Sequence, residues 1–152
     1  MVKPDVLQKY SLFGGLEEEQ IENIIPLMQK QNFEPDEIII TEGMPNDKIF
    51  FLIEGRVEVK KEGIVLTNFN EGEAFGEMEV LDVMPAIASI KALTRAATIS
   101  ISNKTLHDIY KMDIKAFSLL LMNLARDLSR RLRKMDEIFA PQEKLNEPLI
   151  FI

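Results

Sequence analysis

The stretch from Phe75 to Ser89 holds residue types that could bind a phosphorylated ligand. Gly76 has no Cβ, so the backbone beside it can lie close to a ligand or to another strand. Backbone N–H groups at the start of a short helix can bind an anion. The carboxylate of Glu77 can accept hydrogen bonds from a sugar hydroxyl. These residues are compatible with a ligand site, and a purely structural Phe-Gly-Glu turn is the alternative.

The same stretch resembles the phosphate-binding cassette of the cyclic-nucleotide-binding domain family, which includes the catabolite activator protein and the regulatory subunit of protein kinase A. The family pattern is Phe-Gly-Glu, then apolar-Ala-apolar-apolar, a short gap, Pro-Arg and small residues. The positions that fit are Phe75, Gly76, Glu77, Met78, Val80, Leu81 and Pro85. The resemblance covers residues 5–139. It implies that Gly76, Glu77, Met78 and the backbone at Glu79 and Ile87 hold the phosphate, and that Glu77 also holds the ribose 2′-hydroxyl.

Two departures from the family pattern fall at informative positions. Where the family has an arginine after the proline, this chain has Ala86. Where the family has an alanine between the apolar positions, this chain has Glu79. A buried charge without its partner costs roughly 3–5 kcal/mol, which corresponds to a loss of affinity on the order of a hundredfold or more. Glu79, where it faces the pocket, repels the phosphate, and Ile87 offers no hydroxyl group. We therefore expect binding of cAMP and cGMP to be weakened or lost.

Length and composition indicate one domain of 152 residues with a net charge of −7. This charge argues against a protein body that binds nucleic acid. The chain has no cysteine, which excludes disulfides and Cys-based zinc sites and fits a reducing compartment. The N-terminus lacks the apolar core of a signal peptide, and no apolar run approaches the roughly 20 residues of a membrane span. We expect a soluble, cytoplasmic protein.

The order of elements predicts a mainly β fold, a jelly-roll barrel with helices at both ends. Residues 1–30 are expected to hold helices over 5–10 and 16–29. The barrel is predicted over 33–102, with the cassette at 75–89. The predicted strands are Glu37 to Thr41, Lys48 to Ile53, Arg56 to Lys61, Ile64 to Phe69, Ser89 to Leu93 and Ala96 to Ile101. Gly43, Gly55, Gly63 and Gly72 separate strands at fairly even spacing, which is typical of barrels and jelly rolls. Residues 95–98 have the sequence Arg-Ala-Ala-Thr, which also occurs in the family cassette, but they lie nine residues after the expected position. We expect them to form the start of the last strand, with Arg95 at its entry.

The C-terminal part, 103–140, is predicted to form two helices, capped by Asn103 and Asp113. The second, from Ile114 to about Phe139, carries an apolar stripe too long for one small barrel to cover, which indicates a homodimer seam. The expected seam residues are Phe117, Leu121, Leu124, Leu128, Leu132 and Met135. In the family this helix closes over the ligand base, which implies contacts from Arg131, Met135 and Asp136. Pro141 is expected to end the helix, and a tail over 141–152, with no DNA-binding domain after it, is expected to dock or to be a free end.

No constellation of catalytic or metal-binding residues is evident. The chain has a single histidine, His107, whereas metal sites need clusters of ligands. We expect no metal, no cofactor and no enzymatic activity. The leading hypothesis is a regulatory or sensor module of the family, with a cyclic nucleotide as the candidate ligand. The alternatives are a ligand-free dimeric scaffold for a protein partner and, more remotely, a metal-dependent barrel enzyme of the cupin type.

Overall fold

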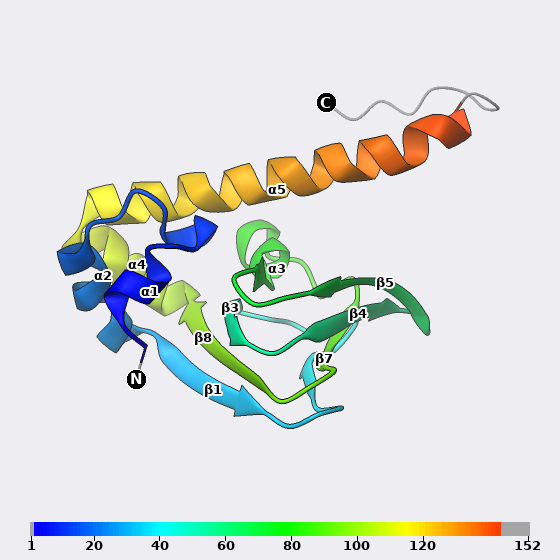
Figure 1. Cartoon of the computed structure of the whole chain (residues 1–152), viewed down its shortest axis with the longest axis horizontal. Coiled ribbons are helices and arrows are strands. Elements are labelled where there is room, and N and C mark those ends of the chain that lie inside the picture. The colour runs from blue at the N-terminus through cyan, green and yellow to red at the C-terminus, as the bar shows by residue number, and fades with distance from the viewer. Residues whose placement is uncertain (1, 144–152) are drawn as a thin grey trace.

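Two antiparallel sheets of four strands each form the centre of the computed structural model, which describes residues 2–143 (Figure 1). In the first sheet the strand order is β1 (Gln29–Phe33), β8 (Ala96–Ser102), β3 (Lys48–Glu54) and β6 (Ala74–Phe75). In the second it is β2 (Ile38–Ile40), β7 (Ser89–Ala92), β4 (Val57–Lys61) and β5 (Ile64–Phe69). The predicted mainly β fold with helices at both ends is confirmed.

The strands end at the predicted glycine turns. The β4–β5 hairpin turns at Glu62 and Gly63, whose φ angles are 50° and 80°, as a two-residue hairpin of the favoured handedness requires. Gly55, with φ 92°, follows β3 and lies against Arg95 and Ala96 at the start of β8. A Cβ at this position would lie 2.2 Å from the carbonyl oxygen of Arg95, so no larger residue fits without movement of the backbone.

The apolar side chains form two buried clusters. One lies between the helices and the first sheet and includes Phe13, Phe51 and Leu120. The other lies between the two sheets and includes Phe50 and Phe75, whose rings stack with centroids 5.2 Å apart. The second cluster forms the interior of the barrel and continues directly into the cassette.

The N-terminal helices are shorter than predicted. The helical elements are α1 (Pro4–Leu7), η1 (Ser11–Phe13), α2 (Glu18–Ile24) and η2 (Ile25–Leu27). The prediction of one helix from Leu16 to Gln29 was wrong beyond Ile24. Pro26 has no N–H group for the α-helical ladder, so the chain tightens into a 3₁₀ turn and then becomes extended at Met28. As a result β1 begins at Gln29, inside the region assigned to helices.

Two helices follow the barrel, α4 (Asn103–Met112) and α5 (Ile114–Glu143). The cap of α4 is Ser102 rather than Asn103, because its hydroxyl accepts a hydrogen bond of 3.1 Å from the Thr105 N–H. The predicted cap of α5 is confirmed, since the Asp113 carboxylate accepts from the Ala116 N–H at 3.1 Å. The prediction that Pro141 ends α5 was wrong: the helix runs to Glu143, and a proline can distort a helix without ending it. The tail from 144 to 152 lies outside the described residues.

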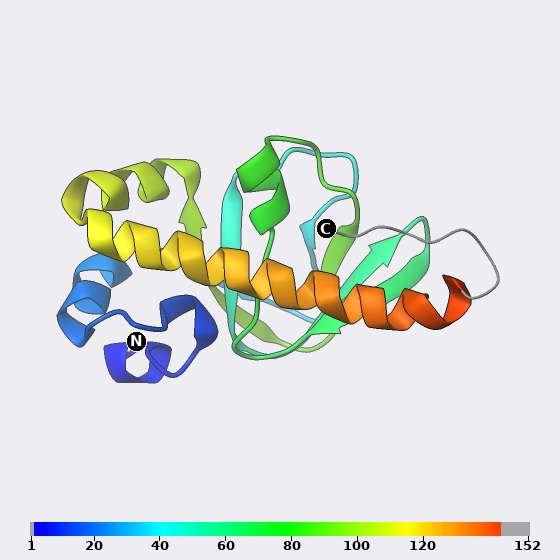
Figure 2. The same ribbon diagram turned by 90° about the horizontal axis from the view of Figure 1, so that it is seen from above.

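The long helix α5 runs along one side of the two sheets and passes α3 (Glu77–Asp82) of the cassette (Figures 1 and 2). Its first half packs on its own domain: Leu120 and Leu124 are 1% and 3% exposed. Leu124 is therefore not available to a second copy, which corrects its assignment to the seam. Phe117 and Leu121 are partly buried against the same cluster.

Candidate functional site

The cassette begins where β6 ends, at Gly76, a position where a residue with a Cβ would not fit. Gly76 has φ 82° and precedes α3. A Cβ on it would lie 2.7 Å from the Lys48 carbonyl oxygen and 2.9 Å from the Asn46 amide nitrogen. Asn46 Nδ2 donates hydrogen bonds to the carbonyls of Lys48 and Gly76, at 2.8 and 3.1 Å. The sequence allows the backbone at Gly76 to lie close either to a ligand or to another strand. The structure shows a close approach to Lys48, the first residue of β3.

Position 86, the family arginine position, lies inside the barrel. The Gly43 N–H donates to the Ala86 carbonyl at 2.8 Å, and the Ala86 N–H donates to the Met44 carbonyl at 3.0 Å. Ala86 is 4% exposed and belongs to the apolar cluster between the sheets. A side chain at this position therefore starts in the interior, and in this chain that side chain is a methyl group.

A buried ion pair joins the cassette to α5. Arg131 Nη1 lies 2.6 Å from Glu77 Oε1, and the Glu77 side chain is 5% exposed. Arg131 Nη2 donates to the Ala74 carbonyl, and its guanidinium carbon lies 4.6 Å from the centroid of the Phe69 ring. This geometry combines a charge-assisted hydrogen bond with a cation–π contact. Arg131 thus binds the two residues on either side of Phe75-Gly76 from a helix far along the chain.

The two cassette carboxylates have raised pKa values. Burial raises the pKa of Glu77 above its ordinary value, and the adjacent Arg131 opposes this rise in part. Burial also raises the pKa of Glu79, with added repulsion from Glu77 and Asp82 and partial compensation by hydrogen bonding. The cassette is therefore a place where added negative charge is unfavourable.

The other predicted contacts are placed differently. The side chains of Met78, Ile87 and Met135 are 44%, 53% and 45% exposed, so none of the three is buried in the barrel interior. Asp136 is partly buried, and its Oδ1 atom is buried with no hydrogen-bond partner among residues 2–143. The contribution of Phe69 was missed, because stacking between a strand end and a distant helix leaves no signal in local spacing.

The other candidate cations near the barrel are engaged elsewhere. Arg95 immediately precedes β8, as predicted, and forms two hydrogen bonds of 3.2 Å with the Glu34 carboxylate. Lys91 Nζ lies 3.5 Å from Asp36 Oδ1. Lys48 Nζ donates to Gln29 Oε1 at 3.0 Å. Each of these side chains would have to leave its partner to replace an arginine at position 86.

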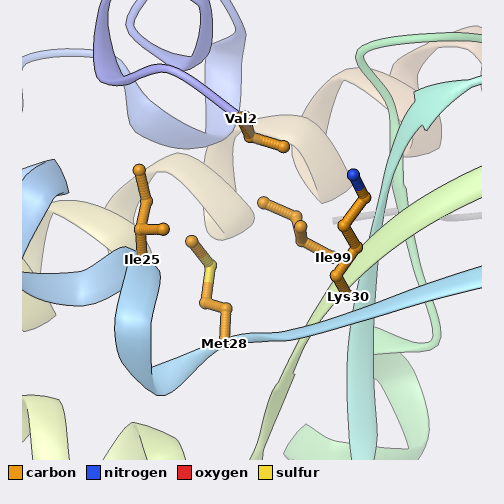
Figure 3. A pocket seen from close by; sticks show the side chains of 5 residues that line it. All are labelled: Val2, Ile25, Met28, Lys30 and Ile99. Carbon is orange, nitrogen blue, oxygen red and sulfur yellow. The ribbon is translucent and has the colours of Figure 1, made fainter.

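A separate apolar cavity of about 110 Å³ lies among the N-terminal elements (Figure 3). Its lining residues are Val2, Ile25, Met28, Lys30 and Ile99. None of them belongs to the cassette or to α5, so this cavity is distinct from the candidate site. The part of the chain that the structure describes contains no cluster of three or more His, Cys, Asp or Glu side chains suited to a metal ion. It also contains no helix that is long and apolar enough to span a membrane.

Known proteins match this chain in sequence and in fold. The family model of the cyclic nucleotide-binding domain matches residues 30–113, more than half of the chain. The human cGMP-dependent protein kinase 2 is 29% identical over 125 residues, which are 82% of this chain and 16% of the kinase. This chain thus spans only a small part of that kinase.

Two solved structures share the fold. A cyclic nucleotide-binding domain from Methylobacillus flagellatus superposes with a TM-score of 0.82 at 26% identity, covering 96% of this chain and 84% of that one. A regulatory subunit of a cAMP-independent protein kinase A from Trypanosoma brucei, in a triply substituted form bound to cAMP, gives a TM-score of 0.68 at 20% identity, covering 93% and 50%. The chain belongs to the cyclic nucleotide-binding domain family, whose members are regulatory modules.

Proposed function

We propose that this chain is a non-enzymatic regulatory module whose cassette binds cAMP and cGMP weakly or not at all. The observation that supports this most is the buried methyl group of Ala86, at the position where the family holds the cyclic phosphate with arginine. A phosphate bound by backbone N–H groups alone would keep its charge at the barrel interior without a counter-charge. That arrangement costs roughly 3–5 kcal/mol relative to a paired charge.

The electrostatics of the cassette support the same proposal. Glu77 is already paired with Arg131, and Glu79 lies close enough to Glu77 for their charges to repel. A cyclic phosphate would add a third negative charge to this group. Arg131 already contacts the cassette, and its use by a phosphate would leave the buried carboxylate of Glu77 without its partner.

The protein from Trypanosoma brucei offers a parallel in its substitution pattern. That protein is described as cAMP-independent, and its cAMP-bound form carries Glu to Ala, Thr to Arg seven residues further on, and Val to Ala directly after the arginine. In this chain Glu79, Ala86 and Ile87 have the same spacing. The parallel supports the proposal that Glu79 and the missing arginine at position 86 lower the affinity of this cassette for cAMP.

Calorimetric titration of the purified chain tests the proposal directly. We expect no saturable heat with cAMP or cGMP up to about 1 mM, a concentration at which even a binding free energy of about −4 kcal/mol would be detected. Thermal unfolding with and without 1 mM nucleotide is the second readout, because a bound ligand raises the unfolding temperature. Micromolar binding in both experiments would contradict the proposal and would require another cation at position 86.

We further propose that the module is a homodimer formed through the outer face of α5. Residues spaced alternately by four and three along this helix are Leu121, Ala125, Leu128, Leu132, Met135 and Phe139. This is the spacing of a coiled-coil seam. Leu132 and Met135 are 46% and 45% exposed, so they are available to a second copy. The proposed seam therefore excludes Leu124 and Phe117, which pack on the chain's own core, and uses the adjacent face of α5.

Leu132→Asp is expected to give monomers at micromolar concentration, because two carboxylates would face each other across the seam. The measurement is sedimentation velocity or light scattering over a dilution series. Met112→Asp is the matched control, since Met112 is 48% exposed but lies on α4, away from the seam. A monomeric wild-type chain, or a Leu132→Asp variant that remains dimeric, would show that α5 is not the interface.

A further inference from the structure

The outer surface of the cassette carries a cluster of exposed large apolar side chains. They are Met44, Met78, Leu81, Val83, Met84 and Ile87, with exposed fractions between 44% and 83%. We call these residues the cassette patch. Two backbone hydrogen bonds join the segment of Met44 to Ala86, and Asn46 joins it to Gly76, so the turn before β3 and the cassette are one surface.

Methionine accounts for three of these six side chains. Methionine is unbranched and polarisable, and it adapts its shape to different partners, which is why it is common on surfaces that bind helices. The fold leaves all six of these apolar side chains exposed to water. Met-rich apolar surface of this kind marks a site that a partner covers.

Acidic residues neighbour the patch residues in the sequence. Glu42 and Asp47 flank Met44 in the sequence, and Glu79 and Asp82 lie on α3 between the apolar residues. Residues 41–47 and 71–90 contain no lysine, arginine or histidine. A partner that covers this surface must therefore bring apolar side chains for its centre and positive charges for its edge.

The backbone conformation of Val83 indicates that the patch serves a purpose other than folding. Its backbone lies in the left-handed region, with φ 57° and ψ 34°, which is unfavourable for a β-branched residue. Its side chain is 83% exposed, so no burial compensates for this conformation. Asparagine or glycine would fit the same backbone better and would expose no apolar side chain.

We propose that the cassette patch binds a cationic amphipathic helix of a partner protein. The apolar centre matches the apolar stripe of such a helix, and the acidic edge matches its lysine or arginine residues. The same acidic edge disfavours an anionic membrane as the occupant. This inference goes beyond the proposed function, because the patch faces away from the barrel interior and is present whether or not the cassette holds a nucleotide.

Methyl NMR of the full chain, with ¹³C-labelled methionine methyl groups, tests this proposal. The probe is a designed helical peptide of about 14 leucine and lysine residues, and its control has glutamate in place of lysine. We expect saturable shifts at Met44, Met78 and Met84 with the lysine peptide alone. Met112 and Met122 are 48% and 51% exposed and lie outside both the patch and the proposed seam, so they report non-specific contact and are expected not to shift.

Three results would overturn the proposal: equal shifts at all exposed methionines, equal binding of the glutamate peptide, or no shift with the lysine peptide up to about 1 mM. A fourth is a shift of the patch methyl groups on anionic phosphatidylglycerol vesicles but not on the peptide, which would assign the patch to a lipid surface.

Val83→Asn separates binding from folding. We expect this variant to bind the lysine peptide about tenfold more weakly, since a buried apolar contact is lost, while its unfolding temperature stays equal or rises. Met122→Ser, an exposed apolar side chain removed elsewhere, is the control and is expected to bind like the wild type. Unchanged affinity of a folded Val83→Asn variant would contradict the assignment of Val83 to the interface.

Discussion

The double substitution Ala86→Arg with Glu79→Ala is expected to tighten cAMP binding by a factor on the order of a hundred or more relative to the wild-type chain. Position 86 is 4% exposed, and its side chain starts in the barrel interior, in the apolar cluster that includes Phe75. An arginine there can form a bidentate pair with the cyclic phosphate. Glu79→Ala removes a partly buried carboxylate that repels the same phosphate. Calorimetric titration measures the gain.

A matched control distinguishes a restored pocket from a general increase in positive charge. Ile87→Arg with Glu79→Ala has the same net charge, but the side chain at position 87 is 53% exposed and points outward, so no gain in affinity is expected. Without nucleotide, the arginine at position 86 is buried and unpaired, so the double variant is expected to unfold at a lower temperature than the wild type. Saturating cAMP is expected to reverse this loss. A folded double variant that does not bind cAMP at about 1 mM would refute the role that we give to position 86.

The strands were predictable wherever turn chemistry marks their ends. β5 begins at Ile64 and ends at Phe69 as predicted, because Glu62-Gly63 permits only a tight hairpin before it. β1 was not predictable by the same reasoning. Its sequence, Gln29 to Phe33, is mostly polar and its residues alternate poorly, since four of the five are exposed or half-buried. It is a strand because it pairs with β8 along its whole length, which is a tertiary contact.

The cassette backbone was also predictable, but its link to α5 was not. The Phe-Gly-Glu motif identifies the turn, and Gly76 has the positive φ that this turn requires. The ion pair between Glu77 and Arg131 joins residues 54 positions apart, and no local pattern encodes it. The family resemblance placed Arg131 near a ligand base, whereas the structure places it on the cassette carboxylate.

The apolar stripe of α5 shows a limit of periodicity. The stripe is wide enough to contact two surfaces, and hydrophobic spacing does not tell which residues face which surface. Leu120 and Leu124 are buried in the chain's own core, whereas Leu132 is exposed one face away. Only the position of α5 relative to the first sheet and to η1 decides this division.

Arg131→Leu is expected to lower the free energy of unfolding by about 2–4 kcal/mol, because it leaves the buried carboxylate of Glu77 without its partner. The value lies below that of a fully buried pair, since the Arg131 side chain is 30% exposed. The loss of the hydrogen bond to Ala74 and of the contact with Phe69 acts in the same direction. Urea unfolding at neutral pH measures the effect. Glu77→Gln combined with Arg131→Leu removes both charges and is expected to recover most of the lost stability.

The pH dependence of the Arg131→Leu variant separates this explanation from a simple loss of packing. Burial already raises the pKa of Glu77, and removing the arginine takes away the largest effect that opposes this rise, leaving only a backbone hydrogen bond to oppose it. A carboxyl group with a raised pKa in the folded state binds its proton more tightly there than in the unfolded chain, so folding is destabilised as pH rises through the folded pKa. The stability deficit of the variant should therefore be largest at neutral pH and should shrink as pH falls towards the ordinary pKa of a glutamate. A deficit that is equal at pH 5 and pH 7.5, or that persists in the double variant, would mean that Arg131 stabilises the domain by packing alone.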